Sequence, residues 1–328
     1  MRDADDVATG LAASAAGPVF VPCPDLGVLR IVGPDRVEAM HRIVTQELRD
    51  LRPGAGRLAL LLAPKGQFQA LMAVFGAQEE LRVLCPPRRG REVAAALGKY
   101  LRFSKSRIEE VAAGGALLLF GAGWEEVASG LGAARDRLRA GGWCTSAPAD
   151  FPVGWFGETM LGFSSVFAVA TDAPTAARLG DELRVAGARE VVTAVAELER
   201  IRNGWPVWGA ELTATVLPPE VGIEKAAISD RKGCYVGQET IARLRSRGHV
   251  NRCLVGVRQI AGPLEGLATP LPLTHAGEGR PCGALTSFAL PPHLGGVGLA
   301  VVRREVGEAG ARLEGDGRSF EVTTLPLW

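Results

Sequence analysis

Apolar residues change their spacing several times along the chain, and each spacing predicts a different element. Residues 28–32 form an apolar run typical of a strand, and residues 34–44 then show apolar positions at helical spacing. Residues 58–75 hold two apolar runs joined by a Pro-Lys-Gly turn, which predicts a β-hairpin. A further strand at 81–86 and a helix at 91–102 follow. Up to about residue 250, strands and helices therefore mix as in an α+β fold.

Two expected helix ends carry local signals. Asp172 stands two residues before Pro174, as an N-cap should. Residues 190–204 place apolar side chains on one stripe and finish on Gly204, which favours a helix end. Residues 1–17 carry three aspartates and no long apolar run, so we expect a loose arm there.

The pattern changes after residue 250. Four short, partly alternating apolar segments are separated by glycine and proline turns: CLVGVRQI, PCGALTSFAL, GVGLAVVRR and SFEVTTL. No segment with helical spacing lies between them. This pattern predicts a small antiparallel barrel or sandwich, with a domain boundary near Asn251.

Composition restricts the class of protein. The 328 residues, 47% hydrophobic and 22% charged, describe a globular chain long enough for two or three domains. A net charge of +1 gives no global reason to expect nucleic acid or an acidic membrane as a partner. No export signal and no bilayer-length apolar run are visible. The six scattered cysteines fit reduced thiols, so we expect a cytoplasmic protein without a membrane contact.

Several common site motifs are missing from the sequence. FGAGWEEV follows an expected strand, but Glu126 stands where a dinucleotide site needs its third glycine. There is no Walker A motif, no H-E-x-x-H and no G-x-S-x-G. The four histidines are far apart in sequence, and His41 lies on an apolar stripe as a packing residue. We therefore predict no metal site.

The stretch SDRKGCYVGQET, at 229–240, places a thiol in an unusual setting. Lys232 precedes Cys234, and a helix is expected to begin shortly after the cysteine. The ammonium group and the helix start both favour a thiolate, whereas Asp230 and Glu239 oppose it. We expect a modestly activated thiol. From the residues alone, a buried structural cysteine in a tight turn is the alternative.

Two further groups are candidate binding residues. Residues 240–264 hold five arginines and no acidic residue, which indicates an anion-binding surface or, alternatively, a solvated helix face. No aromatic residue is interleaved with these arginines, so we expect no nucleic-acid partner. Trp205 and Trp208, close to Arg200, could stack a planar heterocycle or plug a domain interface.

Together these pieces resemble a known family. KGCYVGQE matches K-G-C-Y-x-G-Q-E, the signature of the YgfZ family of folate-binding proteins. RIRNGWPVWGAEL, PPEVGIEKAAISDRKGCY and RGHVNR occur in the order and spacing of that family, and the resemblance covers residues 20–304. The family is in turn similar to the glycine-cleavage T protein, an aminomethyltransferase that uses tetrahydrofolate.

The resemblance implies an α+β fold in the form of a three-domain, T-protein-like ring around folate. A discontinuous folate-binding domain at 1–52 and 114–250 would carry a ferredoxin-like insertion at 53–113. A C-terminal antiparallel β-barrel would follow at 251–328. The implied cofactor is tetrahydrofolate or a one-carbon derivative of it.

Site residues carry over position by position. The resemblance implies catalytic roles for Cys234 and Lys232, and WFGETMLGF, with Glu158, resembles a T-protein loop that contacts the pterin. Arg202 stands where the T protein has a glutamate. With the two indoles and one arginine of the 240–264 run, the candidate cofactor-binding residues are Arg200, Trp205, Trp208, Glu158, Gly233, Tyr235, Gly237, Gln238, Glu239 and Arg243.

The implied function is that of a folate-binding accessory protein that supports iron–sulfur enzymes, including those that thiolate tRNA. The thiol of Cys234 would work at the folate cavity, and iron–sulfur client proteins would be the partners of a monomer. One alternative is a tetrahydrofolate-dependent aminomethyltransferase of glycine-cleavage type. Another is a non-catalytic module that binds RNA or protein. Whether a substrate is turned over stays open at this point.

Overall fold

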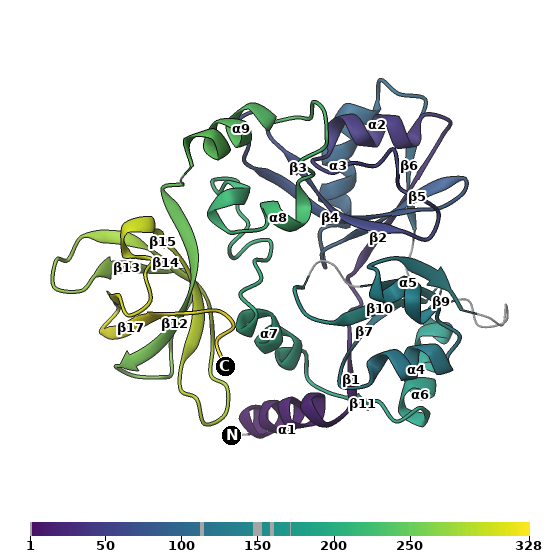
Figure 1. Ribbon diagram of the computed structural model, residues 1–328. Coiled ribbons are helices and arrows are strands. Elements are labelled where there is room, and N and C mark those ends of the chain that lie inside the picture. Colours follow the sequence, from purple (N-terminus) through teal and green to yellow (C-terminus); the bar gives the residue numbers. More distant parts are fainter. Residues whose placement is uncertain (1, 112–114, 147–152, 158–160, 171, 249) are drawn as a thin grey trace.

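Two open sheets and a closed barrel organise the chain (Figure 1). The computed structural model describes residues 2–111, 115–146, 153–157, 161–170, 172–248 and 250–328. The strands of the first sheet are β1 (Pro18–Pro22), β7 (Gly115–Gly121), β8 (Trp143–Thr145), β9 (Val153–Gly157), β10 (Ser165–Ala170) and β11 (Arg189–Glu190). Their order is β11-β1-β7-β10-β9-β8, with β1 and β11 parallel and the other pairs antiparallel.

The second sheet is fully antiparallel and takes the order β3-β4-β5-β2-β6. Its strands are β2 (Gly27–Val32), β3 (Gly56–Leu62), β4 (Phe68–Gly76), β5 (Glu80–Cys85) and β6 (Arg107–Val111). The helices α2 (Arg36–Ile43) and α3 (Gly90–Leu101) cover one of its faces. β2 lies between β5 and β6, so residues 27–32 belong to this sheet. The resemblance instead implies an insertion that starts at residue 53. That division remains a prediction.

The C-terminal residues form a closed antiparallel barrel, as predicted. Its strands are β12 (Arg252–Ala261), β13 (Leu271–His275), β14 (Pro281–Ala289), β15 (Val297–Arg303), β16 (Arg312–Gly315) and β17 (Arg318–Thr323). They close in the order β12-β15-β14-β13-β16-β17. The short 3₁₀ helix η2 (Arg304–Val306) follows β15. The barrel interior holds apolar side chains such as Val257, Leu285 and Phe320.

The remaining helices connect these units. They are α1 (Arg2–Ala16), α4 (Trp124–Gly130), α5 (Arg135–Arg139), α6 (Ala173–Val185), α7 (Thr193–Arg202), η1 (Pro218–Glu220), α8 (Glu224–Ala227) and α9 (Gln238–Arg247). Figure 1 shows α7 and α8 between the barrel and the two open sheets. Within the described residues, no helix has both the length and the apolar character needed to cross a bilayer.

Helix α1 corrects the expectation of a loose N-terminal arm. Leu11 and Ala13 pack against buried side chains of the first sheet and its neighbours. A Cβ added at Gly10 would lie 2.5 Å from Cγ2 of Val195, so this glycine lets α1 approach α7 closely. The alanines of α1 favour a helix, and a few widely spaced side chains attach it to the rest of the protein. Because these side chains are not consecutive, the sequence shows no long apolar run that would have predicted the docked helix.

Local signals at the other helix ends are confirmed. The carboxylate of Asp172 accepts a hydrogen bond from the backbone N–H of Thr175 at 2.8 Å and caps α6. Gly204 follows α7 with φ +70°, and Gly248 caps α9 with φ +78°. Both glycines adopt the left-handed conformation that ends helices.

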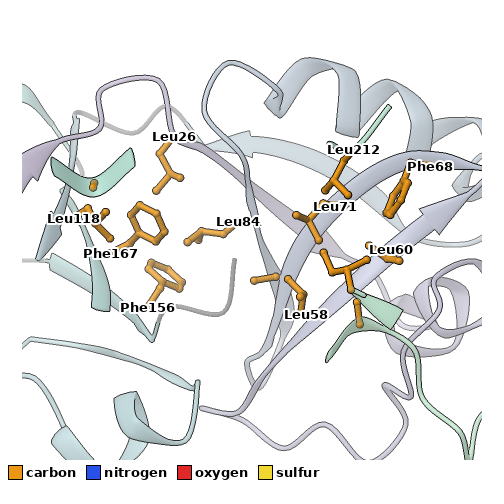
Figure 2. Close-up of a cluster of buried hydrophobic side chains, with 14 of the residues drawn as sticks. Leu26, Leu58, Leu60, Phe68, Leu71, Leu84, Leu118, Phe156, Phe167 and Leu212 are labelled. Atoms are coloured by element: carbon orange, nitrogen blue, oxygen red, sulfur yellow. The ribbon is translucent and has the colours of Figure 1, made fainter. Parts of the chain in front are cut away.

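One apolar cluster, here called the central cluster, fills the space between the two open sheets (Figure 2). Leu58, Leu60 and Leu62 of β3 point into it, while Ala59 and Leu61 point toward α2 and α3. The first sheet alternates in the same way. Phe156 and Phe167 face the central cluster, whereas Phe20, Leu119 and Trp155 face α4, α5 and α6. Both sheets are therefore buried on both faces.

Truncation of the central cluster tests its contribution to stability. Leu60→Ala should lower the free energy of unfolding by about 2–5 kcal/mol, because a fully buried leucine leaves a cavity when shortened. Leu290→Ala, at a residue that is 46% exposed, should change it by less than about 1 kcal/mol. Urea titration of both variants measures the difference, and equal effects would contradict this packing.

Candidate functional site

The residues 232–239, here called the signature turn, run from the loop after α8 into the first turn of α9, against the β3–β4 hairpin. Gly237 has φ +83°, and a Cβ placed on it would lie 2.5 Å from the carbonyl oxygen of Ala63. Across the contact, a Cβ on Gly66 would lie 3.0 Å from Cβ of Thr240. Two backbones therefore meet here at a separation that only glycine allows.

The segment that precedes the signature turn is hydrogen-bonded to Thr45, next to the second sheet. Thr45, fully buried, donates from Oγ1 to the carbonyl oxygen of Ala227 at 2.6 Å. Its own carbonyl accepts from the N–H of Ser229 at 3.1 Å, and its Oγ1 accepts from the N–H of Leu60 at 2.9 Å. One threonine thus joins β3 to α8. No sequence signal identified it, since its partners are distant along the chain.

Lys232 holds the start of the signature turn against the end of α2. Its ammonium group donates to the carbonyl oxygen of His41 in the last turn of that helix, where a positive charge is favourable. Burial lowers the pKa of Lys232 to about 8, although the nearby carboxylate of Glu47 opposes this shift. In this geometry Lys232 is a positioning residue for the turn that carries Cys234.

His41 is a packing residue, as expected. It is 3% exposed, and its Nδ1 accepts from the backbone N–H of Leu48 at 3.4 Å. Oε1 of Glu47 lies 3.1 Å from the same nitrogen. Burial and, secondarily, the ammonium of Lys232 lower the pKa of this imidazole.

Cys234 is the exposed thiol of the six, which excludes a buried structural cysteine. Cys85, Cys144 and Cys282 are buried, and Cys23 and Cys253 are partly so. Burial raises the pKa of all five of these thiols, that of Cys23 to about 11. The thiol of Cys234 is therefore accessible; its activation and its place at a folate cavity stay predictions.

The other signature residues shape the turn or lie on its surface. The N–H of Tyr235 donates to Oε1 of Gln238 at 3.1 Å, and the N–H of Gln238 donates back to the Tyr235 carbonyl at 3.3 Å. Glu239 and Arg243 form an exposed ion pair one helical turn apart in α9. Gly233 is exposed. These contacts explain the form of the turn; contacts of its residues with folate stay predictions.

Arg200, itself buried, lies near the end of α7 in an ionic network with the half-exposed Glu197 and the buried Glu211. Its guanidinium reaches Glu197 with Nε at 2.9 Å and with Nη2, and Nη2 also reaches Oγ of Ser287 at 2.7 Å. Nη1 donates to the Trp205 carbonyl at 2.6 Å and to Glu211 at 3.3 Å. All five N–H donors of the arginine are thereby used.

This network connects α7 to the barrel. Glu211, fully buried, also accepts from the hydroxyls of Thr286 and Ser287 of β14, at 2.7 and 2.6 Å. A direct contact between Arg200 and folate would require one of its five donors to be released. The geometry therefore gives Arg200 a structural role, and its predicted contact with folate is untested.

Trp205 and Trp208 line two different cavities of the protein. Trp205 lines a cavity of about 320 Å³ between the end of α7, η1 and β12. Cys253 and Leu325 also line it. The indole N–H of Trp205 is buried and has no acceptor among the described residues. Trp208 instead stacks under the guanidinium of Arg89, 5.2 Å from the ring centroid, at a narrow crevice.

A second cavity, of about 470 Å³, contains residues that the sequence did not single out as a site. Glu199 and Arg202 of α7 line it together with Phe163 and the C-terminal Trp328. Burial raises the pKa of Glu199. Arg202 donates from Nε to the Trp328 carbonyl at 2.8 Å. Only the folded chain brings residue 328 to α7, so sequence spacing could not show this cavity.

The arginines after Thr240 are largely paired. Arg245 contacts Asp230 at 2.6 Å, and Arg252 contacts Glu220 at 2.8 Å. Glu158 lies outside the described residues. Within the described part of the chain, no group of three or more histidine, cysteine, aspartate or glutamate side chains is placed to hold a metal ion.

Comparison with known proteins shows which proteins this chain resembles in sequence. No protein-family model matches the chain. A tRNA-modifying protein YgfZ from Pectobacterium carotovorum subsp. carotovorum (strain PC1) is 28% identical over 255 residues, covering 74% of this chain and 71% of that protein. A tRNA-modifying protein YgfZ from Serratia proteamaculans (strain 568) is 27% identical over 276 residues, covering 82% and 80%. The chain is a relative of the YgfZ proteins.

The fold agrees with this relationship. The crystal structure of glycine cleavage system aminomethyltransferase T from Bartonella henselae matches with a TM-score of 0.83. The match covers 98% of this chain and 89% of that chain at 15% identity. The expected α+β, T-protein-like fold with a C-terminal barrel is confirmed, and the signature turn of this YgfZ relative lies within it.

The buried ammonium of Lys232 gives a pH-dependent stability that can be measured. Its pKa in the folded protein, about 8, lies below its ordinary value of 10.5. The folded chain therefore loses this proton before the unfolded chain does, and its stability gains as pH rises from about 8 to 10.5. The difference in unfolding free energy between the natural protein and Lys232→Met should shift in favour of the natural protein from pH 7 to pH 9.5.

Urea titrations at the two pH values check this shift. Lys65→Met, on the exposed tip of the neighbouring hairpin, is the matched control and should show a constant difference. A constant difference for Lys232→Met as well would contradict the burial of its ammonium group.

Proposed function

We propose that this YgfZ relative is a folate-binding accessory protein that supports iron–sulfur enzymes, including those that thiolate tRNA. Tetrahydrofolate, or a one-carbon derivative of it, is the cofactor. The accessible thiol of Cys234 acts in that support, on a turn that Lys232 and Gly237 hold in place. The relationship to YgfZ proteins and the T-protein fold make folate the first ligand to test.

The observation that carries the folate proposal is the cavity lined by Trp205. Its volume of about 320 Å³ lies in the range of small-molecule sites. An indole offers a flat face for a pterin, and its buried N–H has no protein acceptor among the described residues. Because that nitrogen is buried, a ligand carbonyl or ring nitrogen would supply one only after the indole turned toward the cavity. When bound, the folate would supply the one-carbon chemistry, while this chain's residues hold and orient it.

Folate binding at Trp205 predicts a specific fluorescence response. Reduced folate should quench tryptophan emission in a saturable manner. Trp205→Phe should remove most of that quenching and weaken binding roughly three- to tenfold, because the ligand loses one hydrogen bond. Trp328→Phe, in the cavity of Arg202 and Glu199, is the control and should bind folate as the natural protein does.

The outcomes separate the two cavities. Weaker binding in Trp328→Phe with unchanged binding in Trp205→Phe would move the folate to the second cavity. The lack of any saturable signal at millimolar folate would remove the central premise of the proposal.

The thiol proposal predicts a reactive and functionally necessary Cys234. Iodoacetamide should label it first, since burial shields the other five thiols and raises their pKa values. Mass spectrometry resolves the labelling rate of each cysteine. Cys234→Ser should keep the unfolding free energy within about 0.5 kcal/mol, because the side chain is exposed.

In cells that lack the protein, Cys234→Ser should fail to restore the activity of tRNA-thiolating iron–sulfur enzymes. Cys23→Ser is the matched control, at a partly buried thiol that does not line the Trp205 cavity. Full restoration by Cys234→Ser would show that the thiol is dispensable. A glycine-cleavage assay with a lipoyl carrier tests the aminomethyltransferase alternative separately.

A further inference from the structure

The turn from α3 to β6 presents a phenylalanine to solvent. Phe103 is 85% exposed and is the most exposed aromatic side chain among the residues that the structure describes. Burying such a ring would normally be favourable, because its transfer from water is worth about 1.5–3 kcal/mol. Residues 99–107 are here called the Phe103 turn.

Hydrogen bonds brace the backbone of the Phe103 turn on either side of the exposed ring. The carboxylate of Asp35 accepts from the backbone N–H of Lys105 at 2.9 Å and from the hydroxyl of Ser106. The hydroxyl of Ser104 donates to the Leu101 carbonyl at 2.7 Å. Leu101, before the ring, is buried under the second sheet. These contacts fix the backbone on both sides of Phe103.

Several cations are close to Phe103 in the sequence. Lys99, Arg102, Lys105 and Arg107 are exposed, and residues 99–107 contain no acidic side chain. The guanidinium of Arg102 lies 4.9 Å from the centroid of the Phe103 ring. Arg107 also pairs with Glu109 at 2.9 Å. The turn therefore combines a stacked Arg–Phe pair with several positive charges.

We propose that the Phe103 turn is a docking point for single-stranded nucleic acid. A base stacks on the Arg102–Phe103 pair, and the neighbouring lysines and arginines contact the phosphates. An aromatic ring set among cations is the combination that single-strand binders use. The expectation of no nucleic-acid partner came from residues 240–264, which lack an aromatic residue; the Phe103 turn has one.

The surroundings of the ring favour this partner over a protein or a membrane. A stable protein interface has an apolar core of several residues, whereas Phe103 is a single ring between Arg102 and Ser104. A membrane anchor likewise needs a larger apolar face than one side chain. Stacking of one base requires one ring only.

Fluorescence anisotropy with the full-length protein tests the proposal. The probes are a labelled 12-nucleotide oligoadenylate RNA, the same sequence in DNA, an RNA duplex, and vesicles rich in phosphatidylserine. Single strands should bind more tightly than the duplex, and binding should weaken from 50 to 200 mM salt. Equal affinities for the RNA and the DNA single strand would show that binding depends on base stacking and phosphate contacts and not on the 2′-hydroxyl.

Variants of the ring separate stacking from apolar burial. Phe103→Ala and Phe103→Leu should both weaken single-strand binding by about fivefold or more, and Phe103→Trp should restore it. None should alter folding, since the side chain is 85% exposed. Val185→Ala, at a residue that is also 85% exposed but lies on α6, is the control and should bind as the natural protein does.

Charge variants complete the test. Lys99→Ala with Lys105→Ala should reduce the salt slope by about 0.7 for each cation that contacts a phosphate, whereas Arg312→Ala on the barrel should leave it unchanged. No single-strand binding at 50 mM salt, or equal binding by Phe103→Ala, would overturn the proposal. If the protein binds the vesicles and Phe103→Leu still binds them, the proposal would also be overturned, in favour of a membrane contact.

Discussion

The position of the signature turn depends on the burial of apolar side chains between the two open sheets. The segment from Leu212 to Ile241 contains only the single turn η1, the four-residue α8 and the start of α9. Helices this short are unstable alone. Leu212, Ile223 and Ile241 nevertheless lie fully buried in the central cluster. The hydrophobic effect therefore places a segment of little intrinsic order, and the thiol it carries takes its position from that packing.

Polar contacts then select one arrangement among those that apolar burial would permit. Thr45 joins α8 to β3 through side-chain and backbone hydrogen bonds, and Glu211 joins the segment after α7 to β14. Arg200 and Glu211 would be expensive to bury singly, but each finds its hydrogen-bonding partners in the other and in the barrel. Loss of Arg200 would leave the buried carboxylate of Glu211 without a cation, whereas loss of Glu211 would leave Arg200 its ion pair with Glu197. The barrel is thus connected to α7 by directional contacts as well as by packing.

The sequence predicted features that depend on neighbouring residues and missed those that depend on distant ones. The β3–β4 hairpin, the Asp172 cap and the barrel strands follow from local spacing and turn residues, and the structure confirms them. The pairing of β2 between β5 and β6, the docking of α1 and the cavity that includes Trp328 depend on contacts across long separations. The resemblance supplied the three-part ring, which spacing alone could not. Arg200 illustrates the limit: its type and position suggested a ligand contact, but only tertiary structure shows that its donors are occupied.

Within the signature turn, neighbouring residues have opposite physical requirements. Lys232 is drawn toward the second sheet, where its ammonium meets the end of α2 at the expense of partial desolvation. Two residues later Cys234 is exposed, and Gly237 then returns the backbone to contact with Ala63. Anchors on both sides leave the thiol exposed on a backbone that has little freedom to move. The role that we propose for this thiol needs an open approach and a fixed position, since positioning before reaction reduces the entropy lost in reaching the productive geometry. The order of a cation, a thiol and a glycine in this turn provides that combination.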